Sequence, residues 1–350
     1  MWRSFPNAKN PKLWIDKRSN LKTAFSLYNP YSPKGQIAKK IVCMLPAIIG
    51  DLLLKPINSG KLLNKFNTYK NNIDKILDID TVINISPGTK SKHQKTSIQI
   101  IHNKEIKYYL KVSNNIETIE LSKNEYTVLN LLSTNQLTAF TPNAIFGDFI
   151  ESNYYLIQSA APKGFSQSEI EFSSAHEQCI IDFYNLHNNI INIQDHIDTI
   201  IDHVSNDHSN EINTILATLN KLIEKHKKTN INLSFTHGDF APWNILTNNR
   251  NELFIFDWEH GNNNSPLLFD FFHFHYMTCK LLTNNTAIEI KEYIDSLYLE
   301  NKYQNIFTHM NINNADYQLY SKLYLLQIIT REIKENNSPS KITVNIFNML

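Results

Sequence analysis

The chain has 350 residues, 42% of them hydrophobic and 19% charged, and a formal net charge of +1. This balance argues against a nucleic-acid-binding protein or one that binds acidic surfaces, because neither sign of charge dominates. Its three cysteines fit no zinc-site spacing, so we expect reduced thiols in a cytoplasmic protein of about two domains.

The first 75 residues are expected to form a basic, partly helical N-terminal extension. Its most apolar segment, residues 41–54, is too short to span a bilayer and contains Asp51. Lysines flank this segment, so residues 39–55 could form an interfacial helix at the inner face of a membrane. A helix packed on the body of the protein is the favoured alternative.

Two strands are predicted within residues 81–101, separated by the sequence Ser-Pro-Gly-Thr-Lys-Ser at positions 86–91. Glycine in such a loop lets backbone N–H groups approach a phosphate. Ser86, Gly88 and Ser91 are therefore candidate phosphate contacts. A loop with a single glycine is, however, a weak fingerprint.

A further strand is predicted over residues 106–112 and an amphipathic helix over residues 119–132. The strand carries Lys111 and the helix carries Glu125. Lys107 is a competing lysine, because it lies on the same face of an ideal strand as Lys111.

Residues 154–162 are predicted to form a strand that leads into a small, turn-prone Ser-Ala-Ala-Pro segment. The same residues are equally consistent with a plain domain linker. Beyond them, amphipathic helices are expected over residues 179–193 and 212–222, as walls of a mainly helical region.

The most informative pattern lies in residues 236–259, where Thr-His-Gly-Asp-Phe-Ala-Pro-Trp-Asn is followed by a short turn and Leu-Phe-Ile-Phe-Asp-Trp-Glu. Phosphoryl transfer needs a carboxylate to orient the attacking hydroxyl and oxygen ligands for magnesium. Asp239 and Asn244 lie in a predicted loop, and Asp257 ends a predicted buried strand. The alternative is an ordinary turn capped by an aspartate, followed by an unrelated strand.

A helix start is predicted at Asn-Ser-Pro, with Ser265 as the N-cap and Pro266 at the first helical position. Asp270 then falls inside an apolar helix, where a carboxylate needs strong hydrogen bonds. His273 and His275 point in different directions on a helix, so they are expected to be core or surface residues rather than metal ligands.

The order His-x-Asp, four residues, Asn and a hydrophobic strand ending in Asp is similar to the catalytic and metal loops of the protein-kinase-like fold. With Gly238 after the histidine and Asp-Trp-Glu in the second loop, the pattern resembles the aminoglycoside phosphotransferase and choline kinase family. The resemblance implies an α+β, bilobal fold. Its small strand-rich N-lobe would span residues 76–161 and its larger, mainly helical C-lobe residues 162–350, after the extension over residues 1–75.

The resemblance also implies roles for the residues of the second half of the chain. Asp239 would be the catalytic base, and Asn244 and Asp257 the ligands of Mg²⁺. His237 would brace the metal loop, and Asp270 would brace the catalytic loop.

In the first half, Lys111 would hold the α- and β-phosphates of ATP and pair with Glu125. Main-chain groups from Ser159 to Ala161 would contact adenine. The family often has a degenerate phosphate loop, which suits the single Gly88.

The acceptor is expected to be a small molecule or a glycan. Gly238 stands where regulated protein kinases carry arginine, and no Ala-Pro-Glu signature follows Asp257. Residues 240–243, together with residues 266–274 downstream, are similar to those of bacterial members associated with surface polysaccharide synthesis. Aminoglycoside kinase, choline or ethanolamine kinase, a catalytically inactive binding scaffold and protein kinase remain the alternatives.

Overall fold

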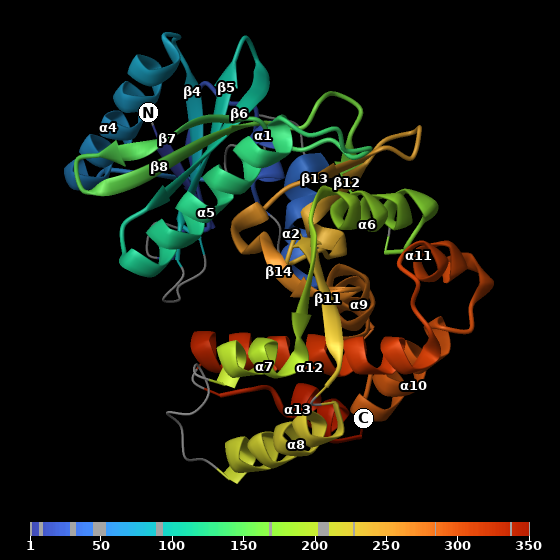
Figure 1. Ribbon diagram of the computed structural model, residues 1–350. Coiled ribbons are helices and arrows are strands. Elements are labelled where there is room, and N and C mark those ends of the chain that lie inside the picture. The colour runs from blue at the N-terminus through green and yellow to red at the C-terminus, as the bar shows by residue number, and fades with distance from the viewer. Residues whose placement is uncertain are drawn as a thin grey trace. The chain divides into compact units, whose positions relative to one another are not determined.

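The computed structural model describes residues 2–6, 10–28, 33–44, 54–88, 94–167, 170–201, 210–226, 228–283, 285–336 and 338–349. They form two compact units (Figure 1). The first unit comprises Met1–Asn130 and Pro142–Ala161, and the second comprises Leu131–Thr141 and Pro162–Leu350. The predicted α+β class is confirmed, since an eight-stranded antiparallel sheet is combined with many helices.

The first unit is built on one sheet with the strand order β3-β1-β2-β4-β5-β6-β8-β7. Its strands are β1 (Trp2–Phe5), β2 (Leu13–Asp16), β3 (Lys55–Pro56), β4 (Val82–Ser86), β5 (Thr96–His102), β6 (Glu105–Ser113), β7 (Ala144–Ile150) and β8 (Asn153–Ser159). Its helices are α1 (Leu21–Ser26), α2 (Pro33–Met44), α4 (Gly60–Leu77) and α5 (Ile116–Ser133), of which the last turn belongs to the second unit.

Strands β1, β2 and β3, from the segment predicted as an N-terminal extension, belong to the same sheet as β4 to β8. The predicted boundary at residue 75 falls inside α4. The predicted interfacial segment, residues 39–55, lies largely outside the described residues, which omit 45–53. Within the described part of the chain, no helix is both long and apolar enough to cross a membrane.

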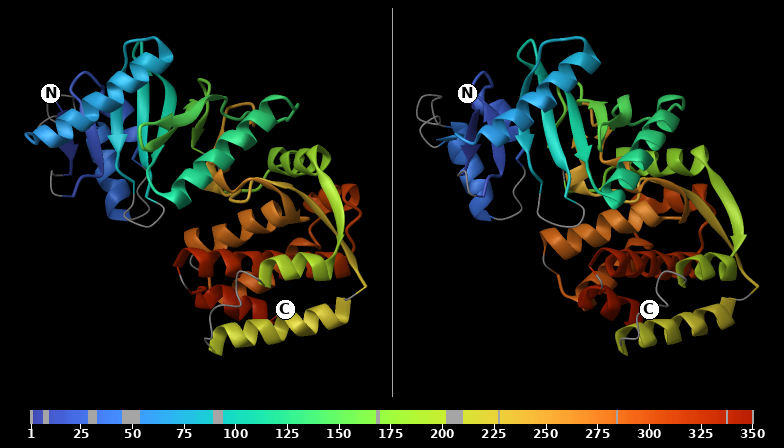
Figure 2. Two further views of the ribbon diagram at one scale, coloured as in Figure 1. Left: turned by 60° about the vertical axis from the view of Figure 1, so that its left-hand side comes forward. Right: turned by 90° about the vertical axis from the view of Figure 1, so that its left-hand side faces the viewer.

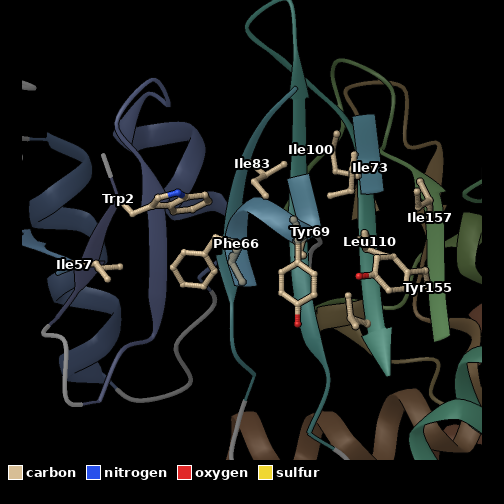
Figure 3. Packing of buried hydrophobic residues seen from close by; sticks show 13 residues of the cluster. Trp2, Ile57, Phe66, Tyr69, Ile73, Ile83, Ile100, Leu110, Tyr155 and Ile157 are labelled. Carbon is tan, nitrogen blue, oxygen red and sulfur yellow. The ribbon is translucent and has the colours of Figure 1, made fainter. Parts of the chain in front are cut away.

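Helix α4 covers one face of the sheet (Figure 3). Its residues Phe66, Tyr69 and Ile73 pack on apolar side chains that alternate along the strands, such as Leu110 and Val112 of β6. Because side chains alternate across a strand, Lys111 points to the opposite face. Helix α5 contributes Glu125 there.

Helix α5 also packs closely on β7. A Cβ atom added at Gly147 would lie 2.3 Å from the ring of Tyr126. Glycine at this strand position therefore lets the helix approach the sheet. The Ser113 and Ser122 hydroxyls, 2.8 Å apart, join β6 to α5 a second time.

The second unit has two small sheets, with strand orders β10-β11-β14 and β13-β12-β9. The strands are β9 (Ser166–Gln167), β10 (Asn188–Asn192), β11 (Asn230–Thr236), β12 (Ile245–Thr247), β13 (Leu253–Ile255) and β14 (Asn262–Pro266). The α-helices are α6 (Ser174–Leu186), α7 (Ile193–Ile201), α8 (Asn210–His226), α9 (Phe269–Met277), α10 (Ala287–Leu297), α11 (Gln304–His309), α12 (Asn314–Asn336) and α13 (Lys341–Met349). Short helical turns are η1 (Pro242–Asn244), η2 (Trp258–His260), η3 (Thr278–Leu282) and η4 (Asn301–Tyr303).

Helix α12 packs against α9, and α13 packs against both α10 and α12 (Figure 2). Helix α9 is almost entirely buried, so its polar residues Asp270, His273 and His275 are surrounded by protein. A buried polar side chain needs hydrogen-bond partners. The partners of Asp270 and His273 lie in the candidate site.

The end of one predicted helix and the start of another are strands instead. The helix expected over residues 179–193 ends at Leu186, and residues 188–192 pair with β11 as β10. The helix expected to start at Ser265 starts at Phe269, because residues 262–266 pair with β11 as β14. The Ser265 hydroxyl accepts a hydrogen bond from Thr236 and donates one to Asn262, so it does not cap a helix.

Candidate active site

Strand β11 ends at Thr236, and a tight loop begins at His237. Gly238 has a φ of 80°, and a Cβ atom there would lie 2.3 Å from the His260 carbonyl oxygen. Both observations require glycine at this position. Gly238 is thus explained by the local backbone.

The Asp270 side chain of α9 binds the backbone of this loop. Its carboxylate accepts the His237 N–H at 2.6 Å and the Gly238 N–H at 3.0 Å. Burial raises the pKa of Asp270 to about 7, whereas the two N–H bonds act in the opposite direction. These bonds therefore offset part of the cost of burying the carboxylate.

His237 connects the loop to the end of β13. Its Nδ1 accepts the Asp239 N–H at 3.1 Å, so the proton of the neutral ring lies on Nε2, which donates to the Phe256 carbonyl at 3.0 Å. Burial lowers the pKa of His237 to about 4, which keeps the ring neutral. The imidazole thus joins the two segments that carry Asp239 and Asp257.

Asp239 is held at both carboxylate oxygens. His273 Nε2 lies 2.9 Å from Oδ1, and the Asn244 amide nitrogen donates to Oδ2 at 2.7 Å and to the Asp239 carbonyl at 2.9 Å. The side chain is still 26% exposed. Burial acts to raise its pKa, but the hydrogen bond from His273 and the nearby Arg331 charge hold the pKa well below 3.8.

Asn244 and Asp257 are brought together by the β12–β13 hairpin. Ile245 pairs with Ile255, and the Phe256 N–H donates to the Asn244 carbonyl at 3.0 Å. Asp257 follows directly, with a φ of 70°. Because the Asn244 amide nitrogen donates to Asp239, its Oδ1 is the atom left for a metal, and one amide oxygen plus one carboxylate suits Mg²⁺.

In the first unit, Lys111 and Glu125 form a close ion pair. Lys111 Nζ lies 2.7 Å from Glu125 Oε1 and 2.6 Å from Oε2. The Glu125 side chain is 0% exposed and that of Lys111 is 14% exposed. The competing Lys107 pairs with Glu105 at 2.7 Å and is 44% exposed.

The residues predicted to contact phosphate lie at the turn after β4. Gly88 has a φ of 72°, and a Cβ atom there would lie 2.3 Å from the Lys95 carbonyl oxygen. The Gln94 amide also donates to the Pro87 carbonyl at 2.7 Å. Gly88 is thus required by the hairpin itself. Ser86 ends β4, and Ser91 lies outside the described residues.

The residues predicted to contact adenine lie at the end of β8, which Ser159 closes, and directly after it. The Ser159 N–H donates to Asn143 and the Ala160 N–H to Lys107, both at 2.9 Å. These two main-chain donors are therefore used inside the unit. A donor for adenine would have to come from Ala161.

Sequence reasoning missed three residues of the second unit. His273 is buried, as expected for a core residue, but it also contacts Asp239. The Tyr324 hydroxyl lies 3.3 Å from His273 Nδ1, and the Arg331 guanidinium donates to the Gly238 carbonyl at 2.8 Å. Tyr324 and Arg331 lie two turns apart on α12, on one face. Their sequence distance from the loop left no local signal.

No protein-family model matches the sequence, and no curated protein shows significant similarity to it. Among solved structures, aminoglycoside phosphotransferase APH(4)-Ia has a TM-score of 0.54 and 12% identity, with 77% of this chain and 93% of that chain covered. A thermostable mutant of the same enzyme in ternary complex with AMP-PNP and hygromycin B has a TM-score of 0.52 and 12% identity, with 77% and 92% covered. Choline kinase LicA from Streptococcus pneumoniae has a TM-score of 0.50 and 12% identity, with 82% and 97% covered. These structures confirm, at the level of the fold, the resemblance that the loop residues indicated.

Proposed function

We propose that the protein is an ATP- and Mg²⁺-dependent phosphotransferase that acts on a hydroxyl group of a small molecule or a glycan. The observation that carries the proposal is the state of Asp239. Two neutral N–H donors hold its oxygens, its pKa is low, and it stays partly exposed. Such a carboxylate is ionised and oriented, as the base of a phosphoryl transfer must be.

Asp239 accepts the hydrogen bond of the acceptor hydroxyl. The hydroxyl oxygen forms a bond to the γ-phosphorus of ATP, and the bond from that phosphorus to the β–γ bridging oxygen breaks. ADP leaves with the electron pair of the broken bond. The hydroxyl proton passes to the Asp239 carboxylate and from there to solvent.

Asn244 Oδ1 and the Asp257 carboxylate would hold Mg²⁺. When bound, the ion neutralises charge on the phosphate oxygens. The hairpin register that sets these two residues side by side supports the assignment. His237 contributes by joining the two loops, and Asp270 by ordering the backbone N–H groups of residues 237 and 238.

Lys111 would bind the α- and β-phosphates, with Glu125 fixing its ammonium group. The short distances of this pair and its burial support the role over that of Lys107. Ala161 would supply the main-chain donor to adenine. The structural neighbour in complex with AMP-PNP and hygromycin B supports a nucleotide and a small-molecule acceptor.

The acceptor class is proposed on the missing Ala-Pro-Glu signature and on Gly238. A sugar or glycan of surface polysaccharide synthesis is the preferred candidate, from the likeness of residues 240–243. The aminoglycoside phosphotransferase and choline kinase neighbours support screening those acceptor classes as well.

The test is consumption of ATP with Mg²⁺, screened against sugars, glycan fragments, aminoglycosides, choline and ethanolamine. We expect Asp239→Asn to lower kcat by about 10²- to 10⁴-fold, the range of a general base. The variant should keep the rise in melting temperature that Mg²⁺ and ADP produce. Asp198→Asn, on the exposed surface of α7, is the matched control and should keep full turnover.

Full activity in Asp239→Asn would contradict the assignment of the base. No turnover with any acceptor, together with no stabilisation by Mg²⁺ and ATP, would favour an inactive binding scaffold. Transfer of phosphate to proteins of a lysate would favour a protein kinase.

A further inference from the structure

Helix α9 presents two polar residues, one turn apart, to the loop at residues 237–239. Asp270 binds the backbone of the loop, and His273 binds the side chain of Asp239. Residues one turn apart lie on the same side of a helix. One helix face therefore sets both the path of the loop and the direction of its carboxylate.

The protons of this network can be assigned from its partners. Ionised Asp239 only accepts hydrogen bonds, so His273 Nε2 must carry the proton of the bond to Oδ1. Burial lowers the pKa of His273, so the ring is neutral and its Nδ1 is an acceptor. The Tyr324 hydroxyl, 3.3 Å away, then donates to Nδ1.

One face of the His273 imidazole also stacks on an aromatic ring. The ring of Phe269 is nearly parallel to that of His273, with an interplanar angle of 9° and centroids 5.8 Å apart. The His273 side chain is 2% exposed. With both nitrogens bonded and the ring stacked, the position of Nε2 is fixed.

Rotation of an aspartate carboxylate about its last torsion is soft. The Asn244 bond to Oδ2 alone would leave that rotation free, whereas a second N–H at Oδ1 restricts it. Resting on the proposed function, we propose that His273, oriented by Tyr324, is a positioning residue for the catalytic base. It holds Asp239 in the orientation that aligns the acceptor hydroxyl with the γ-phosphate.

The test compares His273→Phe, which keeps a ring but removes both nitrogens, with His273→Gln, whose amide nitrogen can occupy the place of Nε2. Turnover is measured as ATP consumption with Mg²⁺ and the acceptor that the unmodified protein uses best. We expect His273→Phe to lower kcat about 10- to 100-fold, as loss of positioning by a fraction of an ångström does, with the KM for ATP unchanged. His273→Gln should recover most of kcat.

Two further variants separate positioning from packing. His273→Phe/Tyr324→Phe removes the buried hydroxyl that the first change leaves unpaired, and should fold while keeping the low kcat. In an Asp239→Asn background, His273→Phe should cause no further loss, because both changes act on one group. Each variant should keep its stabilisation by Mg²⁺ and ADP.

Wild-type kcat in a folded His273→Phe variant would overturn this inference but not the proposed function. Equal loss in the Phe and Gln variants, accompanied by lowered melting temperatures, would assign His273 to packing and overturn it as well. If the unmodified protein turned over no acceptor, the proposed function would fall, and this inference with it.

Discussion

In each unit a carboxylate accepts hydrogen bonds from nitrogen donors, but the donors differ in charge. In the first unit, Glu125 is 0% exposed and pairs with the Lys111 ammonium group. In the second unit, Asp239 is bonded by the His273 imidazole and the Asn244 amide. The Lys111–Glu125 pair has no net charge. The Asp239 carboxylate keeps its negative charge, because both of its donors are neutral.

The difference matters for function. An ion pair with matched charges stabilises a defined lysine position, which suits a residue that binds phosphate. Neutral donors orient a carboxylate without neutralising it, so it can still attract a proton or a cation. The second unit relies on neutral histidines elsewhere too, since His176, His196 and His275 are buried.

The largest expected effect is a difference in acid stability between the two units. Burial lowers the pKa values of His176 and His196 to about 4 and that of His275 to about 3, below the 6.5 of an unfolded histidine. Below pH 6.5 the unfolded chain therefore binds protons that the folded chain does not. The free energy of unfolding of the second unit should fall by about 1.4 kcal/mol per pH unit for each such histidine as the pH drops to 4. Asp270, whose pKa burial raises to about 7, acts in the opposite direction and offsets the effect of about one histidine.

Hydrogen exchange at pH 6.5, 5 and 4, corrected for the intrinsic exchange rate, measures this effect. Exchange in α9 should rise before exchange in β5 and β6. The pKa of Asp16 in the first unit lies below 3.8, because bonds from Arg18 outweigh burial, so its contribution is lost only at lower pH. Exchange that rises in β5 and β6 before it rises in α9 would contradict the expected difference in acid stability. His309→Gln, at an exposed site, is the control and should leave the pH dependence of exchange unchanged.

The next effect concerns the ion pair itself. Lys111→Met leaves Glu125 buried without its partner and should lower the free energy of unfolding by about 3–5 kcal/mol. The double variant Lys111→Met/Glu125→Leu removes both charges and should return to within about 1 kcal/mol of the unmodified protein. Chemical denaturation measures the stability, and titration with ATP measures nucleotide binding.

Nucleotide binding should stay weak in the double variant. Its free energy of unfolding recovers, but it still lacks the Lys111 ammonium group that is proposed to bind phosphate. Recovery of both would show that the pair is only structural. Lys107→Met is the matched control on the same strand, and should cost less than about 1 kcal/mol, since Lys107 belongs to an exposed pair.

The smallest effect is expected at the proposed metal ligands. Asp257→Ala should weaken binding of ADP in the presence of Mg²⁺ by about 10- to 100-fold, or roughly 1.4–2.8 kcal/mol. Calorimetric titration with Mg²⁺ and with EDTA separates the metal from the nucleotide. In EDTA the variant and the unmodified protein should bind ADP equally.

Equal weakening with and without Mg²⁺ would mean that Asp257 acts on the nucleotide or the fold rather than through the ion. Glu252→Gln, in the turn of the same hairpin, is the control. It should leave both affinities unchanged.

Local patterns predicted much of the fold and of the candidate site. The β12–β13 hairpin is short, so the distance from Asn244 to Asp257 along the chain already implied that they lie close together. The strand and helix carrying Lys111 and Glu125 were likewise predicted, because adjacent elements of a chain tend to pack on each other. Local patterns did not indicate that β1 to β3 join a sheet whose other strands lie far along the sequence.

The errors have a common cause. Residues 188–192 were predicted as the end of a helix, and Ser265 and Pro266 as the start of another, but residues 188–192 and 262–266 both pair with β11. Long-range pairing provides hydrogen bonds that override weak helix signals. A serine followed by proline marks a helix start only when no strand competes for the same backbone.

The sequence by itself predicted the reaction class that we propose, because the residues concerned lie within a few positions of one another and their spacing reflects their chemistry. Only the tertiary structure decided what holds the base. His273, Tyr324 and Arg331 come from helices remote in sequence from Asp239, and the packing of these helices brings them to the loop. Contacts between distant segments depend on how whole helices pack, which no local pattern encodes.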